Sequence, residues 1–265
     1  MEIRTGTRAF ITGASRGIGR ALAVELASRG AILGLAARST DELQELAATL
    51  PGTHHVLECD VADEAAVRTA VDRFVELAGG IDLLVANAGI THYGPFRDQP
   101  LEHAKRMTEI NWYGTLYTVH HGLPHMLDAA QGHIVVISSG AALRSFPWAA
   151  VYGATKAAQR MFAEALRHEL SGTGVSLTTV YPGEIATSLH DHEKDTMPDW
   201  YRGGPDAAPA SELAKRIVRS VERDDRSLTF PPLVRALGIL HNLSPKVSDR
   251  LLRALRGGTA APRRD

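Results

Sequence analysis

The chain has 265 residues, of which 44% are hydrophobic and 22% are charged, and its formal net charge is -1. This is the composition of an ordinary globular protein, and the near-zero charge excludes the strong basic field that recruits nucleic acid. The one cysteine, Cys59, excludes an intrachain disulfide and fits a reducing compartment. No run approaches the roughly 18 apolar residues of a membrane span, and the N-terminal residues lack the apolar stretch of a secretory signal. We therefore expect a cytoplasmic protein without a nucleic-acid partner.

Short apolar runs alternate with amphipathic stretches along most of the chain. The expected strands occupy 9–12, 31–36, 55–59, 82–86, 132–138 and 175–181. The expected helices occupy 17–29, 40–50, 63–78, 101–128 and 152–171, with Thr40 or Asp41 as the N-cap of the second. Strands that are apolar almost throughout, each followed by a helix, indicate a parallel sheet covered by helices on both faces. Right-handed crossovers make this an α/β fold with a Rossmann-like, doubly wound sheet.

The alternation ends near residue 185, which divides the chain into two parts of a single predicted domain. Residues 1–185 form the expected dinucleotide-binding and catalytic core. Residues 186–265 are expected to supply a substrate lid at about 188–210 and a C-terminal helical extension of the same domain. A helix at 211–223 and a short strand at 227–230 are expected between them.

A glycine-rich loop, TGASRGIG at 12–19, directly follows the first expected strand and opens the first expected helix. Ligands of doubly wound sheets bind at the carboxyl ends of the strands, and a helix N-terminus attracts phosphate. Glycine permits the tight turn and lets the backbone approach a pyrophosphate closely. The spacing is G-x-x-x-G-x-G rather than the more familiar G-x-G-x-x-G. Its position after the first strand favours dinucleotide binding over a plain glycine-rich turn.

Further motifs follow along the chain in a fixed order. They are Asp60-Val61, Asn87-Ala88-Gly89, Asn111, Ser139, the YGATK segment at 152–156 and Tyr181-Pro182-Gly183. In this order they resemble the motifs of the short-chain dehydrogenase/reductase family, and the resemblance covers residues 7 to about 190. The resemblance implies a catalytic set of Asn111, Ser139, Tyr152 and Lys156. It also implies a nicotinamide dinucleotide held by Gly13, Ser15, Arg16, Gly17, Ile18, Gly19, Arg38, Asp60, Val61, Asn87, Ala88, Gly89, Tyr152, Lys156, Pro182, Gly183, Ile185 and Thr187.

The residues that follow the second expected strand bear on the choice of cofactor. A carboxylate at this point accepts hydrogen bonds from the ribose of NAD, whereas an arginine accommodates the 2′-phosphate of NADP. The segment is Ala36-Ala37-Arg38-Ser39, without a carboxylate, and Arg16 in the glycine loop adds a second cation. Guanidinium groups bind phosphate through charge-assisted hydrogen bonds. Each arginine by itself is as compatible with a solvated surface residue as with a phosphate ligand. The two together favour NADP(H).

Tyr152 and Lys156 are four residues apart, so they share one face of the expected helix. A free phenol has a pKa of roughly 10 and is a poor base near neutral pH. An ammonium group about 4–5 Å away contributes roughly 3–4 kcal/mol at an effective dielectric constant near 20. This interaction lowers the pKa of the phenol by about 2–3 units. Tyr152 is then the expected general acid in reduction and general base in oxidation.

The other members of the catalytic set have expected supporting roles. Ser139 ends an expected strand and would hydrogen-bond the substrate oxygen, while Ser138 is offset by one residue. By family resemblance, Lys156 also holds the nicotinamide ribose, and Asn111 anchors a water that links Lys156 to solvent. The alternative for Asn111 is a residue that kinks the helix.

Aromatic and aliphatic residues near these motifs predict an apolar substrate pocket. The expected substrate contacts are Ser139, Leu143, Trp148, Tyr152 and Trp200. We therefore expect reduction of an apolar ketone or oxidation of an apolar secondary alcohol. Some of these aromatic residues equally fit packing of the sheet or of a subunit interface. The segment HDHEKD at 190–195 lacks a second ligand cluster, so no metal site is predicted, and Cys59 is expected in the core.

The C-terminal residues 231–256 predict basic amphipathic helices. Their apolar stripe consists of Leu251, Leu252 and Leu255, and their basic face carries Lys246, Arg250 and Arg253. Such a segment contacts an anionic membrane surface, packs over the active site or joins a subunit interface. The family resemblance separately implies a homodimer or homotetramer formed through the helices around 101–128 and 152–171.

Three alternative functions stay open from the sequence. They are a dinucleotide-sensing regulatory protein on the same fold, an acyl-carrier ketoreductase with a basic docking patch, and a lipid-ketone reductase at a membrane surface. The tyrosine-lysine pair and Ser139 favour an enzyme over the sensor, because regulatory proteins of this fold usually lack the pair.

Overall fold

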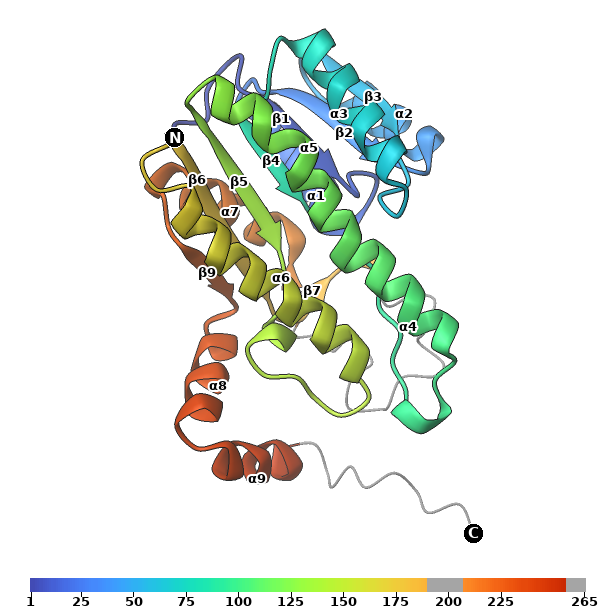
Figure 1. Cartoon of the computed structure of the whole chain (residues 1–265), viewed down its shortest axis with the longest axis vertical. Helices are drawn as coiled ribbons and strands as arrows, with labels where there is room; N and C mark the ends of the chain where they lie inside the picture. The colour runs from blue at the N-terminus through green and yellow to red at the C-terminus, as the bar shows by residue number, and fades with distance from the viewer. Residues whose placement is uncertain (190–206, 256–265) are drawn as a thin grey trace.

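A seven-stranded parallel sheet forms the centre of the molecule (Figure 1). The computed structural model describes residues 1–189 and 207–255, except the side chains of 252, 253 and 255. The strands are β1 (Arg8–Thr12), β2 (Ile32–Ala37), β3 (His54–Glu58), β4 (Leu83–Ala86), β5 (Gly132–Ile137), β6 (Val175–Pro182) and β9 (Ser227–Phe230). Their order across the sheet is β3-β2-β1-β4-β5-β6-β9, and every neighbouring pair is parallel. The expected Rossmann-like sheet is confirmed.

Helices cover both faces of the sheet and bury two separate apolar cores. One face carries α1 (Gly17–Ser28), α2 (Thr40–Thr49) and α7 (Ala210–Arg223). The other carries α3 (Glu64–Ala78), α5 (Gly114–Asp128) and α6 (Ala150–Glu169). Fully buried residues such as Leu22 and Leu26 of α1 each contribute roughly 1.5–3 kcal/mol through removal of apolar surface from water.

The sheet continues beyond the predicted core of residues 1–185. Strand β9 pairs with β6 in the same sheet, and α7 packs against α1. A small second sheet joins β7 (Ile185–Ala186) to β8 (Ala208–Pro209). The C-terminal part of the chain therefore completes the same layered structure.

Two helix details differ from the expectations. The N-cap of α2 is Ser39, whose side chain makes no capping hydrogen bond, so the prediction of Thr40 or Asp41 is wrong. Both predicted residues lie in the first helical turn, where the carboxylate of Asp41 interacts favourably with the helix dipole. The region 101–128 is also not uniformly α-helical. It consists of α4 (Leu101–Met107), a π-helical segment η2 (Thr108–Tyr113) and α5.

The last two helices extend beyond the end of the sheet, as Figure 1 shows at its lower edge. They are α8 (Pro232–Leu243) and α9 (Pro245–Leu255). Arg144 anchors α9, because its guanidinium donates to Ser248 Oγ at 2.9 Å and to the Asp249 carboxylate at 2.6 Å. The pair exposes five apolar side chains, namely Leu233, Ile239, Leu243, Val247 and Leu251. Among the described residues, no helix is long and apolar enough to cross a membrane.

Strand order decides where a ligand can bind. The chain moves outward from β1 to β3 and then returns to β4 on the other side of β1. The connections after β1 and β4 therefore diverge and leave a crevice at the carboxyl ends of these strands. The glycine-rich loop and the Asn87-Ala88-Gly89 segment are these two connections.

Candidate active site

The glycine-rich loop packs directly against the segment after β4. Gly13 has φ +66°, and a Cβ there would lie 2.9 Å from Ala88 Cα. A Cβ on Gly19 would collide with the carbonyl oxygen of Gly13. The amide of Asn87 donates to the carbonyl oxygens of Thr12 and Gly13 at 2.9 and 3.1 Å. These contacts require glycine at both positions and hold the loop open toward the crevice.

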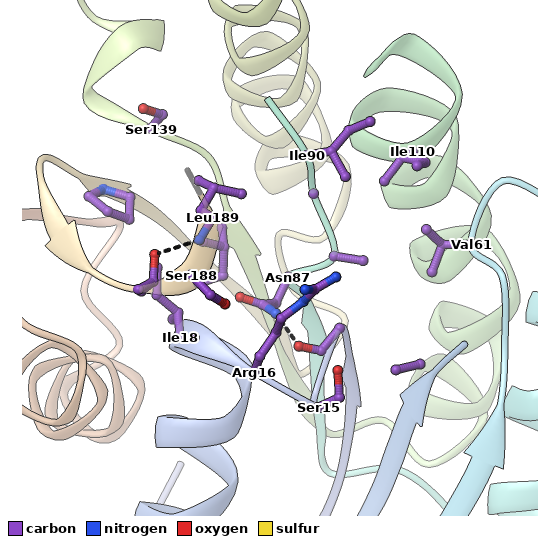
Figure 2. A pocket seen from close by; sticks show the side chains of 18 of the residues that line it. Ser15, Arg16, Ile18, Val61, Asn87, Ile90, Ile110, Ser139, Ser188 and Leu189 are labelled. Carbon is purple, nitrogen blue, oxygen red and sulfur yellow. Dashed lines mark hydrogen bonds between the residues drawn. The ribbon is translucent and has the colours of Figure 1, made fainter. Parts of the chain in front are cut away.

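One continuous cavity occupies this crevice (Figure 2). Every predicted cofactor residue lines it except Gly19, which is buried in the packing of the loop. Figure 2 shows Arg16 and Asn87 directed toward its centre, with Val61, Ile90 and Ile110 on another side. The lining residues that sequence reasoning missed are Ala37, Ser39, Cys59, Ile90, Ile110, Ile137, Ser138, Ser188 and Leu189. All except Ile137 and Leu189 adjoin a predicted residue in the sequence, which is the signal that could have found them.

The loop geometry fits a dinucleotide. Helix α1 begins at the loop, and its N-cap residue, Arg16, makes no side-chain capping hydrogen bond. The first-turn N–H groups of α1 therefore lack a side-chain cap at the helix end that favours negative charge. The side chains of Arg16 and Arg38 line the same cavity and form no ion pair within residues 1–189 and 207–255. The arrangement suits a pyrophosphate and a further phosphate.

Asp60 lies at one end of the cavity in a fixed orientation. Its carboxylate accepts from the Ala62 N–H at 3.0 Å and from the Arg106 guanidinium at 2.9 Å. Burial alone would raise the pKa of the Asp60 carboxyl, but these hydrogen bonds and the charges of Arg106 and Arg38 lower it overall. Arg106 comes from α4, and no motif in the sequence identifies it.

Cys59 also lines the cavity but is not a reactive thiol. It is 2% exposed, and burial raises the pKa of its thiol to about 12, with smaller contributions from Asp60 and Asp63. A thiol of this kind stays protonated at neutral pH and behaves as a core residue.

Tyr152 and Lys156 face the cavity from the first turns of α6. Both are buried, with 6% and 4% exposure, and Lys156 Nζ lies 5.9 Å from the centroid of the Tyr152 ring. The ammonium group donates to the Ile137 carbonyl oxygen at 3.1 Å. Burial lowers the pKa of Lys156 to about 7, because the low-dielectric surroundings disfavour its charged form. Tyr152 and Lys156 thus lie close together on α6, as predicted, and both are more deeply buried than the sequence indicates.

Two adjacent serines at the end of β5 have different surroundings. Ser139 Oγ accepts from the Ala141 N–H at 3.1 Å, and the residue lines the cavity. Ser138 Oγ donates to the Lys156 carbonyl oxygen at 2.8 Å, which ties β5 to α6. Ser139 is therefore the better placed of the two to meet a substrate, as its spacing to Tyr152 predicts.

Asn111 lies in the π-helical segment η2 and is fully buried. Its side chain accepts from the Ile90 N–H at 2.8 Å and donates to the Ile90 carbonyl oxygen and Thr155 Oγ1. Its main-chain carbonyl accepts from Thr115 Oγ1 and from Gln159 Nε2, each at 2.8 Å. Asn111 thus joins the segment after β4 to α6 within an irregular helix. Its role in anchoring a water stays a prediction.

The expected substrate residues do not all gather at the cavity. Leu143 lines a different groove on the molecule and does not line this cavity. Trp148 has a left-handed backbone, with φ +73°, and packs in an aromatic cluster around Tyr152. Within that cluster the Tyr93 and Tyr152 rings lie 5.9 Å apart in an edge-on arrangement. Trp200 and most of the expected lid at 188–210 lie outside the described residues.

A glycine loop at the first helix and a buried tyrosine-lysine pair share one cavity at the switch point of a parallel sheet. Fold and site together define a dinucleotide-binding oxidoreductase of the Rossmann-like class. The family model described as short chain dehydrogenase matches residues 7–198. The chain therefore belongs to the short-chain dehydrogenase/reductase family, whose members bind a nicotinamide dinucleotide.

Individual relatives agree with this assignment. The chain is 34% identical over 249 residues to 11-beta-hydroxysteroid dehydrogenase-like 3 of Arabidopsis thaliana, covering 91% of this chain and 78% of that protein. It is similar to a short-chain dehydrogenase/reductase from Burkholderia phymatum solved with NAD, with 25% identity, TM-score 0.83 and coverage of 93% and 96%. It is also similar to an alcohol dehydrogenase from Thermococcus sibiricus solved with 5-hydroxy-NADP, with 26% identity, TM-score 0.73 and coverage of 84% and 95%.

Proposed function

We propose that the protein is an NADP(H)-dependent oxidoreductase that interconverts an apolar ketone and its secondary alcohol, with Tyr152 as the general acid and base. The observation that carries the proposal is the burial of Tyr152 and Lys156 side by side in the cavity that the glycine loop borders. Bound nicotinamide would supply the hydride. The chain must then handle one proton at the substrate oxygen.

Tyr152 is the group proposed to move that proton. In reduction its hydroxyl gives a proton to the forming alkoxide, and in oxidation its phenolate removes the proton of the alcohol. A cationic Lys156 stabilises the phenolate, and the interaction is stronger in this buried site than in water. Ser139 is proposed to donate a hydrogen bond to the same substrate oxygen and so stabilise its developing charge.

The preference for NADP(H) is supported by two positive charges in the cavity lining. Arg16 and Arg38 both line it, and β2 ends without a carboxylate that could bind a ribose hydroxyl. An added phosphate would meet two guanidinium groups there. The two solved relatives hold an NADP derivative and NAD, so membership of the family alone leaves the preference undetermined.

Substitution of Arg38 tests this preference. We expect Arg38→Asp to lower kcat/KM with NADPH by more than tenfold relative to NADH, since the new carboxylate repels the phosphate and accepts from a ribose hydroxyl. Arg20→Asp is the matched control, because it makes the same charge change on an exposed residue of α1 that does not line the cavity. Equal losses with both cofactors would contradict the assignment.

An apolar substrate is supported by the residues around Tyr152. Its cluster contains Tyr93, Phe146 and Trp148, and Ile90 lies between the cluster and the cavity. The relative named as hydroxysteroid dehydrogenase-like points in the same direction. We expect a panel of ketones, from short-chain to steroid and lipid ketones, to give NADPH oxidation that rises with apolar surface. Tight NADPH binding without turnover of any member would favour the dinucleotide-sensing alternative.

A further inference from the structure

A second cavity lies outside the candidate active site, between α6, β6, β9 and α8. Its volume is about 260 Å³. It is lined by Leu143, Arg160, Glu164, Arg167, Thr179, Tyr181, Arg226, Ser227, Thr229, Arg235, Gly238, Ile239 and Asn242. We call it the arginine groove. None of its lining residues belongs to the cavity that holds Tyr152 and Lys156.

Four guanidinium groups converge on the arginine groove from three parts of the chain. Arg160 and Arg167 come from α6, Arg226 from the turn before β9, and Arg235 from α8. Glu164 is the one carboxylate in the lining. No ion pair involves any of these arginines within the described part of the chain. The lining thus carries about three net positive charges, and Asp224 outside the lining offsets part of this charge at Arg167.

The floor of the groove is polar and ordered. Thr179 and Tyr181 of β6 are 1% and 8% exposed, and both line the groove. Arg167 is held in place, since it donates to the Leu177 carbonyl at 3.2 Å, to Thr179 Oγ1 at 3.2 Å and to the Arg226 carbonyl at 2.9 Å. Thr179 Oγ1 thus holds Arg167 in place and is hydrogen-bonded to Tyr181, so the guanidinium and the phenol are fixed at the floor of the groove.

The cations that line the arginine groove repel one another. Burial is the main cause that lowers the pKa of Arg167, and the neighbouring charge of Arg226 lowers it further. The cations of Arg160 and Arg167 also act on the Tyr181 phenol, whose pKa burial nevertheless raises. Like charges in a partly desolvated groove repel one another more strongly than in water. A multiply charged anion would remove this repulsion.

We propose that the arginine groove binds a phosphate group. Guanidinium forks match phosphate oxygens in bidentate geometry, and the hydroxyl groups of Ser227 and Thr229 also line the groove. The groove is open to solvent at the exposed Arg226 and Arg235, so it can take the phosphate group while the rest of the carrier stays outside. The carrier is a soluble phosphate compound or a phosphate-monoester lipid. This site is separate from the cofactor and does not depend on the proposed reaction.

Calorimetry with inorganic phosphate at constant ionic strength, with the cofactor cavity occupied by saturating NADP⁺, tests the proposal. The double variant Arg226→Ala/Arg235→Ala removes two exposed side chains that form no hydrogen bond among the described residues, so the fold should persist. We expect its Kd to rise at least tenfold. The matched control, Arg20→Ala/Arg68→Ala, removes two exposed arginines that line neither cavity and should change Kd less than twofold. Unchanged binding in the first variant, or loss only in the control, would overturn the proposal.

A second measurement identifies the carrier. The wild-type protein and the groove variant are sedimented with phosphatidylcholine vesicles that contain or lack phosphatidic acid, with and without competing phosphate. If pelleting requires phosphatidic acid and is lost in the variant, the site binds a lipid phosphate. The exposed Leu233 and Leu243 of α8 would then contact the vesicle surface. Calorimetric binding without pelleting assigns it to a soluble phosphate. Pelleting retained by the variant, together with unchanged calorimetry, would contradict the site altogether.

Discussion

The ammonium group of Lys156 is almost completely shielded from water, and this burial lowers its pKa to about 7. In the free protein at neutral pH, a substantial fraction of Lys156 is therefore uncharged. An anionic neighbour, such as a Tyr152 phenolate, would stabilise the charged form again. The two side chains are thus a coupled pair, in which the charge of each depends on that of the other.

The pKa of Lys156 predicts a pH dependence of stability. Between pH 7 and about 10 the unfolded lysine binds a proton that the folded lysine has released, so the free energy of unfolding rises with pH. Lys156→Met should lack this contribution. We expect urea unfolding of the wild type, relative to the variant, to show a slope approaching roughly 1.4 kcal/mol per pH unit in this window. Parallel pH profiles for the two proteins would refute the assignment of the shift.

Residues in short local motifs could be predicted, and residues that depend on loop geometry could not. The glycine loop, Asp60 and Asn87 lie at the cavity because each directly follows a strand, and strand ends meet at one edge of a parallel sheet. Trp148 does not line the cavity: it has a left-handed backbone and packs against the aromatic cluster. Arg106 reaches Asp60 from a helix far along the chain, and no local pattern encodes that contact.

Helix and strand positions follow from hydrophobic periodicity, but helix irregularities do not. The region 101–128 is apolar at helical spacing, which gives no sign of the π-helical segment η2. That segment is associated with buried polar contacts, including Thr115 and Gln159 on the Asn111 carbonyl. These partners belong to two different helices, so the irregularity depends on tertiary packing.

Helix α9 is attached to the rest of the molecule through Arg144. Arg144 is largely buried and makes two charge-assisted or polar contacts with α9, through Ser248 and Asp249. Arg144→Ala should remove roughly 1.5–3 kcal/mol of local stability and increase amide hydrogen exchange across 245–255. Arg73→Ala, which breaks an exposed pair with Glu76 on α3, is the control and should have little effect. Unchanged exchange in α9 would show that other contacts hold the helix.

At the scale of the whole molecule, the sheet order brings distant segments to one crevice. Loops that follow β1, β2, β4, β5 and β6 all contribute to the cavity. The order itself could be predicted, because alternating strands and helices with right-handed crossovers allow few arrangements. The arginine groove could not be predicted, since its cations come from α6, α8 and the turn before β9.

Proteins of this family are commonly oligomeric, and we expect this chain to associate through α6. Met161 of α6 is 61% exposed, and Leu101, Tyr113 and Leu127 in the region 101–128 are exposed as well. Several exposed apolar side chains, unlike a single one, are typical of an interaction surface. We expect the wild type to elute as a dimer or tetramer in size-exclusion chromatography with light scattering. Met161→Arg should shift the mass toward the 28.5 kDa of one chain. Phe96→Arg, at a residue that is exposed outside α5 and α6, is the control. A wild-type monomer, or an unchanged mass in Met161→Arg, would contradict this interface.

The most direct test of the proposed reaction is the turnover of Tyr152→Phe measured beside its affinity for NADPH. The substitution removes one hydroxyl group and leaves the ring that packs against Tyr93. The proposal predicts that kcat falls by about 10²–10⁴-fold, while the Kd for NADPH stays within a few-fold of the wild-type value. A variant that binds NADPH and reduces the substrate at the wild-type rate would show that Tyr152 is not the proton donor.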